Sequence, residues 1–522
     1  MPARTLMLQG TGSSVGKSLL CAALCRIYRR AGIDVVPFKA QNMALNSYVT
    51  RDGLEMGRAQ VVQAEAASVE PTVDMNPVLL KPETGTRCQV IVGGKPVTSL
   101  SAADYFGRKL DLWPTVAEAL DRLRAAHELV VIEGAGSPAE INLRDKDIVN
   151  MRVARYADSP VLLVGDIDRG GVFASLLGTL EWLLPEERAL VRGFVINKFR
   201  GDVRLLAPGP DMLTERTGVP VLGVVPYARD LGIAEEDSVA LDERRETFGE
   251  GAAVDVAVLR LPHISNFDDF DPLEREPSVR LRYVERPQDL GAPDLLILPG
   301  TKTTIPDLTY LRTSGLADSV VGLARAGTPV VGICGGYQML GLRLHDPDGV
   351  ESDGGSAPGL GLLPVETTFV ADKRTCRVEG RVLAGSGLAA ALAGERVVGY
   401  EIHTGRTTGS GGSAIRIERR LDAPADDLDG AVDDAGLVLG TYLHGLFASD
   451  GLRRSLVGWL ASRKRREVAF AESWSRDAAY DRLADLVESS LDMARLADIV
   501  GLRWPPPVPL PAPLQIEEAP GG

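Results

Sequence analysis

The sequence has few of the residues that build disulfide-rich or zinc-stabilised folds. Among 522 residues there are five cysteines and five histidines. The cysteines (Cys21, Cys25, Cys88, Cys334 and Cys376) are scattered and form no Cys-x-x-Cys pair. An odd number of separated cysteines argues against a disulfide framework and against a structural zinc site.

Long apolar runs and an excess of positive charge are also missing. No run approaches the roughly 18 to 20 apolar residues needed to span a bilayer, and the N-terminus lacks the apolar core and cleavage site of a signal peptide. The 57 Lys and Arg residues are outnumbered by 71 Asp and Glu, which gives a net charge of −14. We therefore expect a cytoplasmic protein that binds neither nucleic acid nor a membrane surface.

Length and composition indicate a soluble globular protein with two or three domains. Hydrophobic residues make up 45% and charged residues 25% of the chain, as in ordinary globular proteins. Short β-branched runs separated by helical stretches predict parallel sheets with both faces covered. In the first part of the chain these runs occupy residues 5–9, 33–38, 129–134, 160–166, 193–197 and 220–226.

The predicted fold class is α/β, with two sheet-containing domains. Residues 1–235 form the first of these domains. Residues 236–253 are polar and predict a linker. Residues 254–450 repeat the α/β pattern and become richer in β-strands toward their end. Residues 451–503 are expected to be helices, and the proline-rich tail at 504–522 is expected to be disordered.

A phosphate-binding loop follows the first predicted strand. GTGSSVGKS (10–18) lies between a strand and a helix, where backbone N–H groups and the helix N-terminus can face an anion. Lys17 would pair with the β- and γ-phosphates of ATP, and the Ser18 hydroxyl would bind Mg²⁺. Thr11 occupies the place of the first glycine in the strict pattern, so the loop is a variant. The predicted ATP-binding residues of the loop are Thr11, Gly12, Gly16, Lys17 and Ser18.

Polar residues at other strand ends extend this site. Glu133 ends a buried strand and is predicted to contact Mg²⁺ directly or through water, although acids also occur in simple strand-end turns. Asn197 and Lys198 follow a late strand, where an amide can bind an adenine edge; a structural turn explains the pair as well. Three residues are predicted to contact substrate or phosphoryl groups, with an ordinary polar connection as the alternative: Lys39, Gln41 and Asn42.

A candidate nucleophile lies in the second domain. Cys334 stands in the pattern G-x-C-x-G between a β-branched strand and a helix, which is the thiol version of a nucleophile elbow. The N–H groups of Gly335 and Gly300 are the predicted oxyanion donors. His444, in a glycine-flanked turn after a late strand, is the predicted base. His403 is a second candidate, but contact with substrate or a structural role suits it better.

These segments resemble a known family over nearly the whole chain. The loop, Glu133 and the Asn-Lys pair are similar to the dethiobiotin-synthetase-like ATPase fold. GICGGYQMLG (332–341) and TYLHGLF (441–447) resemble class I glutamine amidotransferase domains of the cobyrinate-amidating subgroup. Further segments resemble the cobyric acid synthase family and run in order through both domains: PFKAQNMALNS (37–47), EMGRAQVVQAEAA (55–67), MNPVLLKP (75–82), GDIDRGGVFAS (165–175), VINKFRGD (195–202) and HISNFDDFDPL (263–273).

The resemblance implies a reaction and its reactants. It is the ATP- and glutamine-dependent amidation of adenosylcobyrinic acid a,c-diamide at its b, d, e and g carboxylates, in cobalamin biosynthesis. The implied cofactors are ATP and Mg²⁺, and the implied partners are glutamine and a corrinoid. One position departs from the pattern: many class I amidotransferases carry Glu two residues after the histidine, where this chain has Leu446. The base then works either in a dyad or with an acid from elsewhere in the chain.

Three other functions fit parts of the pattern. The related a,c-diamide synthase shares both domains but uses a different substrate. Another amide ligase of the same architecture could act on a cell-wall precursor. A non-enzymatic ATP switch of the partition type would explain the phosphate loop, but it has no need of a cysteine elbow in its own domain.

Overall fold

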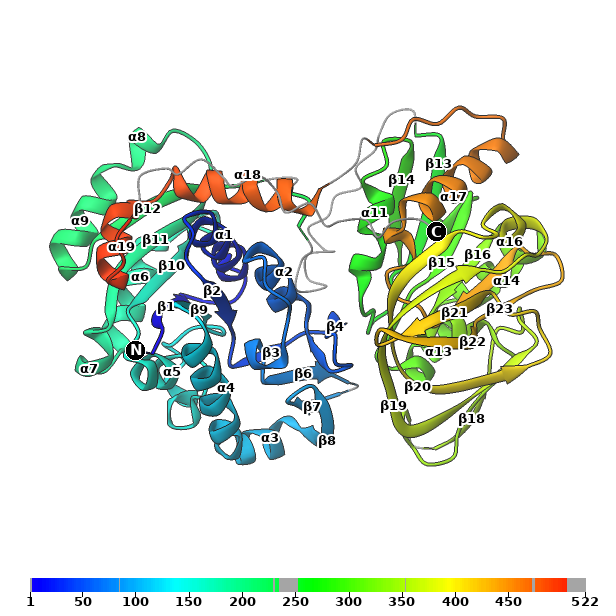
Figure 1. Ribbon diagram of the computed structural model, residues 1–522, viewed down its shortest axis with the longest axis horizontal. Helices are drawn as coiled ribbons and strands as arrows, with labels where there is room; N and C mark the ends of the chain where they lie inside the picture. The colour runs from blue at the N-terminus through cyan, green and yellow to red at the C-terminus, as the bar shows by residue number, and fades with distance from the viewer. Residues whose placement is uncertain are drawn as a thin grey trace.

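The computed structural model describes residues 2–83, 85–228, 231–233, 252–352, 354–471 and 475–504. Two α/β domains lie side by side, with the N-terminal domain on the left of Figure 1 and the C-terminal domain on the right. The predicted fold class is confirmed. Residues 236–251 of the predicted linker and residues 505–522 of the predicted disordered tail lie outside the described residues. In the described part of the chain, no helix is both long enough and apolar enough to cross a bilayer.

The N-terminal domain is built on a six-stranded sheet in which every neighbouring pair is parallel. Each strand arises from one of the apolar runs recognised in the sequence. The strand order is β12-β11-β10-β1-β9-β2. The strands are β1 (Arg4–Gly10), β2 (Val35–Phe38), β9 (Leu129–Glu133), β10 (Val161–Asp166), β11 (Val191–Phe199) and β12 (Val221–Pro226).

Helices cover both faces of this sheet, which explains why its strands are apolar on both sides. One face packs against α1 (Lys17–Arg30), and the other packs against α4 (Trp113–Ala126) and its neighbours. The remaining helices of this part are α2 (Arg58–Ala66), η1 (Val73–Met75), α3 (Ala102–Arg108), η2 (Lys109–Leu112), η3 (Ile141–Lys146), α5 (Met151–Ala157), α6 (Val172–Trp182), α7 (Pro185–Arg188), α8 (Val203–Leu206) and α9 (Pro208–Thr217).

An insertion of short strands follows β2 and extends toward the C-terminal domain (Figure 1). Sequence patterns did not predict it, because β3, β4 and β5 have only three residues each and β8 is exposed along much of its length. Its larger sheet has the order β3-β6-β7-β8, and a separate hairpin pairs β4 with β5. The strands are β3 (Gln41–Met43), β4 (Ser47–Val49), β5 (Glu55–Gly57), β6 (Val78–Pro82), β7 (Arg87–Val92) and β8 (Lys95–Ser101).

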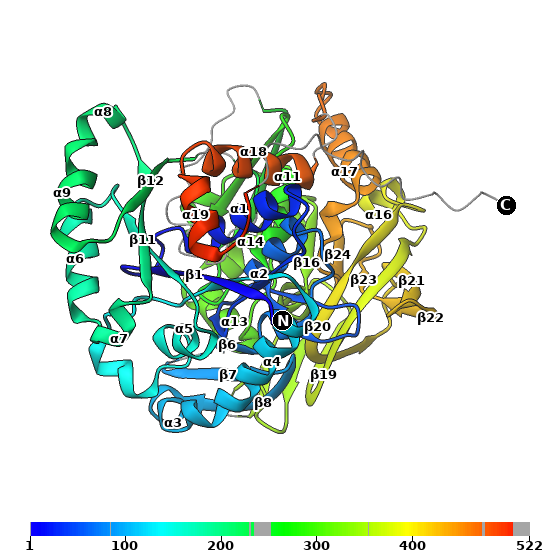
Figure 2. The same ribbon diagram turned by 60° about the vertical axis from the view of Figure 1, so that its left-hand side comes forward.

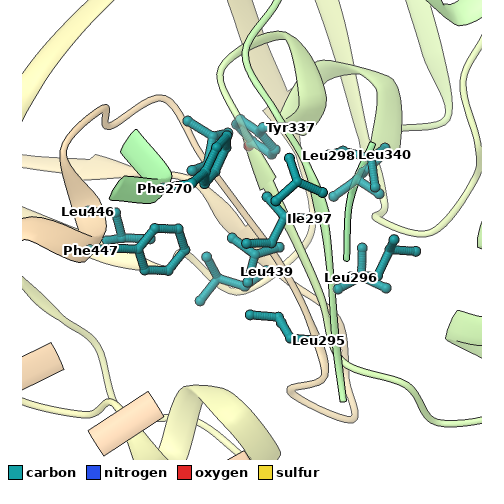
Figure 3. Packing of buried hydrophobic residues seen from close by; sticks show 14 of the residues in the cluster. Phe270, Leu295, Leu296, Ile297, Leu298, Tyr337, Leu340, Leu439, Leu446 and Phe447 are labelled. Carbon is teal, nitrogen blue, oxygen red and sulfur yellow. The ribbon is translucent and has the colours of Figure 1, made fainter. Parts of the chain in front are cut away.

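The C-terminal domain contains a second mainly parallel sheet of order β14-β13-β15-β16-β24-β23, in which only the β23 pairing is antiparallel. Figure 3 shows its core, where Phe270, Leu446 and Phe447 lie near the apolar side chains of β15. The strands are β13 (Val254–Leu259), β14 (Val279–Val284), β15 (Leu295–Leu298), β16 (Val330–Ile333), β23 (Ala431–Val432) and β24 (Val438–Thr441).

A largely antiparallel sheet and several helices complete this domain. The long strands β19 and β20 form the side of the domain that faces the N-terminal domain in Figure 1. The strands are β17 (Arg343–Asp346), β18 (Gly355–Pro358), β19 (Val365–Val382), β20 (Arg396–Gly409), β21 (Ile415–Arg420) and β22 (Ala423–Asp429). The helices are η4 (Phe267–Phe270), α11 (Asp271–Glu274), α12 (Pro287–Leu290), α13 (Thr304–Thr313), α14 (Leu316–Arg325), α15 (Gly335–Leu340), α16 (Gly387–Ala391), η5 (Leu446–Ala448) and α17 (Asp450–Arg463).

The last two described helices return to the N-terminal domain. Both α18 (Arg476–Glu488) and α19 (Met493–Val500) lie against the N-terminal domain in the two views (Figures 1 and 2). Arg26 of α1 pairs with Asp481 at 2.7 Å, and buried apolar side chains of α18 and α19 join the same core as α1. The chain therefore returns to the N-terminal domain after it has formed the C-terminal domain.

Candidate active sites

The phosphate loop closes around the ammonium group of Lys17. Its Nζ donates hydrogen bonds to the carbonyl oxygens of Gly12 at 2.9 Å and Gly136 at 3.2 Å. Gly16 ends the loop with φ of 95°, and a Cβ built there would lie 2.2 Å from Nδ2 of Asn197. Glycine is required at this position for both reasons.

Glu133 is contacted by two other predicted residues, Ser18 and Lys39. Its Oε1 accepts a hydrogen bond from the Ser18 hydroxyl at 2.7 Å and lies 3.0 Å from Nζ of Lys39. Its Oε2 accepts from Nε2 of Gln63 at 2.6 Å. The Glu133 carboxylate is 1% exposed, so a buried charge is held by a cation and by hydrogen bonds from Ser18, Gln63 and, at 3.5 Å, Gln60.

This donor set fits Mg²⁺. A carboxylate and a hydroxyl at a phosphate loop supply hard oxygen ligands, and phosphate oxygens and water complete the octahedron that Mg²⁺ prefers. Ser18 and Glu133 would hold the ion. Lys17 and Lys39 add two positive charges, which suits a bound polyphosphate.

Asn197 and Lys198 contact the loop itself. Nδ2 of Asn197 donates to the Val15 carbonyl at 2.9 Å, and Nζ of Lys198 donates to the Ser14 carbonyl at 2.7 Å. Lys198 also lies 3.1 Å from Asp166. Both side chains therefore brace the part of the loop that a nucleotide would touch.

Gln41 and Asn42 lie on the short strand β3. Nδ2 of Asn42 donates to Gln60 at 3.0 Å, and Gln60 in turn lies 3.5 Å from Glu133. The side-chain oxygen of Gln41 accepts a hydrogen bond from Tyr105. Asn42 is thus connected to the Glu133 site through one side chain, whereas Gln41 is engaged on α3. The loop residue Thr11 donates its N–H to Val164 at 2.9 Å, which fixes the end of β1.

Cys334 occupies a strained turn between β16 and α15. Its φ is 52° and its ψ is −108°, a conformation that residues with a Cβ rarely adopt. The turn also needs a small neighbour, because a Cβ built on Gly336 would lie 2.0 Å from the Leu298 carbonyl oxygen. These are the features of a nucleophile elbow.

His444 lies beside this thiol and is held by an acid that sequence reasoning missed. The thiol is close enough to His444 to raise its pKa, and it also lies 3.5 Å from the Ile402 carbonyl oxygen. Nδ1 of His444 is 2.7 Å from Oδ2 of Asp269, whose Oδ1 accepts the N–H of Gly445 at 2.7 Å. Cys334, His444 and Asp269 form a triad by geometry.

The acid comes from η4 rather than from the position after His444. Leu446, where an acid often lies, is 3% exposed and packs in the core shown in Figure 3. A carboxylate there would be buried among apolar side chains. The only sequence signal for Asp269 was its place in the segment HISNFDDFDPL (263–273), which contains three acids and gave no reason to choose among them.

The two candidate histidines have opposite electrostatic environments. Burial lowers the pKa of His444, but the Asp269 charge and its hydrogen bond, with Cys334, raise it to about 10. Burial dominates at His403, and it lowers the pKa to about 4. Nδ1 of His403 lies 2.8 Å from the Gly405 carbonyl, and its ring stacks on Tyr442 with centroids 3.7 Å apart.

The two predicted oxyanion donors are close to the thiol and the imidazole. Gly335 is the first residue of α15 and directly follows Cys334. A Cβ built on Gly300, just beyond β15, would lie 2.9 Å from Cε1 of His444. Backbone N–H groups at these positions can stabilise an oxyanion formed by attack of the thiol.

Two cavities lie among residues around the triad, and one of them is lined by Asp269 itself. The smaller has a volume of about 460 Å³ and is lined by His403, Tyr442, Glu401 and Arg374, among others. Its opposite charges suit a small zwitterion. The other, of about 520 Å³, lies between the domains and is lined by residues of both, Asp269 included.

Comparison with known proteins agrees with this arrangement of two domains. A family model described as the CobQ/CobB/MinD/ParA nucleotide binding domain matches residues 6–240, and one for the CobB/CobQ-like glutamine amidotransferase domain matches residues 255–452. Cobyric acid synthase of Sorangium cellulosum (strain So ce56) is 58% identical over 96% of this chain and 99% of its own length. Proteins of the same name from Dehalococcoides mccartyi (strain CBDB1) and Desulfitobacterium hafniense (strain DSM 10664 / DCB-2) are 52% and 53% identical, over 95% and 96% of this chain and 99% and 98% of their own lengths.

Proposed function

This chain belongs to the cobyric acid synthase family, and we propose that it amidates the b, d, e and g carboxylates of adenosylcobyrinic acid a,c-diamide with ammonia from glutamine. It is a glutamine-dependent ligase. The observation that carries the proposal is the presence, in one chain, of a phosphate site centred on Glu133 and a Cys334–His444–Asp269 triad.

The N-terminal domain activates the carboxylate. A carboxylate does not react with ammonia to form an amide, because oxide is too poor a leaving group. Transfer of the γ-phosphoryl group of ATP to a carboxylate oxygen gives an acyl phosphate, which ammonia attacks with loss of phosphate. Lys17 and Lys39 would stabilise the charge on the transferring phosphoryl group. Ser18 and Glu133 would hold a Mg²⁺ ion, whose charge would offset that of the phosphate oxygens.

The C-terminal domain releases the ammonia. The Cys334 sulfur attacks the side-chain carbonyl carbon of glutamine, and the N–H groups of Gly335 and Gly300 stabilise the oxyanion. His444 takes the proton of the Cys334 thiol and gives it to the amide nitrogen, the C–N bond breaks, and ammonia leaves behind a thioester. Water then attacks the thioester and gives glutamate and the free thiol. Asp269 keeps the His444 ring oriented and stabilises the imidazolium.

Both active sites belong to one chain, so ammonia can be released close to the site that uses it. Ammonia free in neutral water is mostly protonated and is then no nucleophile. Release of ammonia inside the same molecule avoids that protonation.

The direct test is to count amidations on the corrinoid. The purified protein is incubated with the a,c-diamide, ATP, Mg²⁺ and glutamine, and the products are followed by mass spectrometry. Four amidations are expected, with one ATP and one glutamine consumed for each. Amidation of unsubstituted cobyrinic acid at a and c would instead identify the related diamide synthase activity. The absence of glutaminase and ligase activity would refute the proposal.

A further inference from the structure

Arg58 is a buried cation at the domain interface to which the reaction scheme gives no role. It is the first residue of α2 in the N-terminal domain and is 7% exposed. A positive charge in the first turn of a helix is disfavoured by the helix dipole, so its position requires an acidic partner. That partner belongs to the other domain: Nε of Arg58 lies 3.0 Å from Oδ2 of Asp268.

Asp268 precedes the acid that holds His444. Two buried carboxylates in sequence repel each other, and one of them tends to take up a proton. Burial raises the pKa of Asp268, the Arg58 charge opposes this rise, and the Asp269 charge adds to it. Oδ1 of Asp268 has no hydrogen-bond partner within the described ranges. Arg58 is therefore the main charge that favours the ionised form of Asp268.

Asn266 and Phe267, which precede Asp268, also contact the N-terminal domain. The N–H of Ser47 donates to Oδ1 of Asn266 at 3.2 Å, and Oδ1 of Asn46 accepts from the Phe267 N–H at 3.3 Å. Asn266, with φ of 54°, donates in turn to the Tyr400 hydroxyl at 3.1 Å. The N-terminal domain thus contacts each of residues 266–268, which directly precede Asp269.

The other charges around Arg58 do not replace its contact with Asp268. Glu65 of α2 lies 3.9 Å from Arg58, but it also pairs with Arg476 at 3.2 Å and accepts from Tyr480 at 2.6 Å. Glu65 thus has other partners, whereas Arg58 is the cation that pairs with Asp268 among the described residues. Arg58 also lies over the ring of Tyr48, which a second cation, Arg377, approaches as well. Tyr400 is a further neighbour of Arg58.

We propose that Arg58 is a positioning residue for the glutaminase site, supplied across the interface by the N-terminal domain. This role of Arg58 rests on the proposed roles of Cys334 and His444. By pairing with Asp268, Arg58 balances the charge next to Asp269, so that Asp269 remains the carboxylate paired with Nδ1 of His444. The glutaminase triad is then fully arranged only when the amide-forming domain is docked.

The test compares glutaminase kinetics of full-length variants. Arg58→Met keeps the apolar stem and removes the charge; the expected loss in kcat is about 10- to 100-fold, as for residues that orient a catalytic side chain, with KM for glutamine unchanged. Arg58→Lys should recover most of the rate. Arg377→Met is the matched control, because Arg377 stacks on the same Tyr48 ring but pairs with Glu70 at 2.6 Å, and it should retain the wild-type kcat.

A double variant separates charge neutralisation from simple packing. In Arg58→Met/Asp268→Asn the carboxylate that needed Arg58 is gone, so glutaminase activity should rise above that of Arg58→Met. A double variant no better than the single one would overturn the proposal, as would a wild-type kcat in Arg58→Met. Equal loss of glutaminase and ammonia-dependent amidation in Arg58→Met would show a general structural defect and also overturn it. A wild-type protein without glutaminase activity would instead refute the proposed function, and the Arg58 role with it.

Discussion

Replacing Asp269 by Asn is expected to disable glutamine hydrolysis while keeping the shape of the site. Both carboxylate oxygens of Asp269 face donors: Oδ2 lies 2.7 Å from Nδ1 of His444, and Oδ1 accepts the Gly445 N–H at 2.7 Å. An amide has one acceptor and one donor group. Either its NH₂ group faces Nδ1 and forces the wrong tautomer of His444, or it faces the Gly445 N–H and leaves two donors in contact.

The size of the effect follows from the hydrogen bonds that are lost. A hydrogen bond to a charged group contributes about 1.5–3 kcal/mol, and the amide weakens two of them. If this energy is lost in the transition state, the glutaminase kcat should fall about 10²- to 10⁴-fold, at about 1.4 kcal/mol for each factor of ten. Asp271→Asn is the matched control, since Asp271 is a buried acid of the same segment that lies 3.7 Å from Arg275.

The assay measures glutamate formation and, separately, amidation driven by ammonium salts. Asp269→Asn should lose the first activity and retain the second, and Asp271→Asn should retain both. A glutaminase rate in Asp269→Asn within about threefold of the wild type, well outside the range expected for an orienting acid, would refute the triad.

The pH dependence of stability gives an independent check on the same pair. The pKa of His444 is raised from the ordinary 6.5 to about 10 in the folded protein. Its protonation therefore stabilises the folded state fully below about pH 6.5, and this contribution is lost as pH rises through about 10. Urea denaturation should show a smaller loss of stability between these pH values in Asp269→Asn than in the wild type. An unchanged slope would contradict the charge pairing.

Four further substitutions test the division of work between the domains. Cys334→Ser should abolish glutamine-dependent amidation and leave ammonia-dependent amidation; loss of both in a folded protein would contradict two separate sites. Lys17→Ala should remove amidation with either nitrogen source, because phosphoryl transfer precedes attack by ammonia, and near-normal turnover with ammonium salts would refute the phosphate-loop assignment. His444→Ala should lower the glutaminase rate about 10²- to 10⁴-fold, whereas His403→Ala should affect glutamine binding or stability more than the chemistry, and the opposite result would exchange the two roles.

Much of the fold could be predicted because its signals are local. A strand buried on both faces must be apolar along its whole length, so all six strands of the N-terminal sheet were visible as apolar runs. The phosphate loop and the cysteine elbow are short turns whose backbone geometry demands glycine at particular positions. Gly16, with its φ of 95°, and Gly336, close to a carbonyl oxygen, show that demand in the structure. The short strands of the insertion carry no such signal, and they were missed.

The sequence by itself determined the two α/β domains, the phosphate loop and the candidate pair Cys334 and His444, because each is written in a few adjacent residues. Only the tertiary structure decided which acid holds His444, since Asp269 lies 175 positions away and is one of several acids in its segment. It also decided that α18 packs on α1, where Arg26 and Asp481 meet across 455 positions. Such contacts depend on the path of the whole chain, and no local pattern of polar and apolar residues encodes that path.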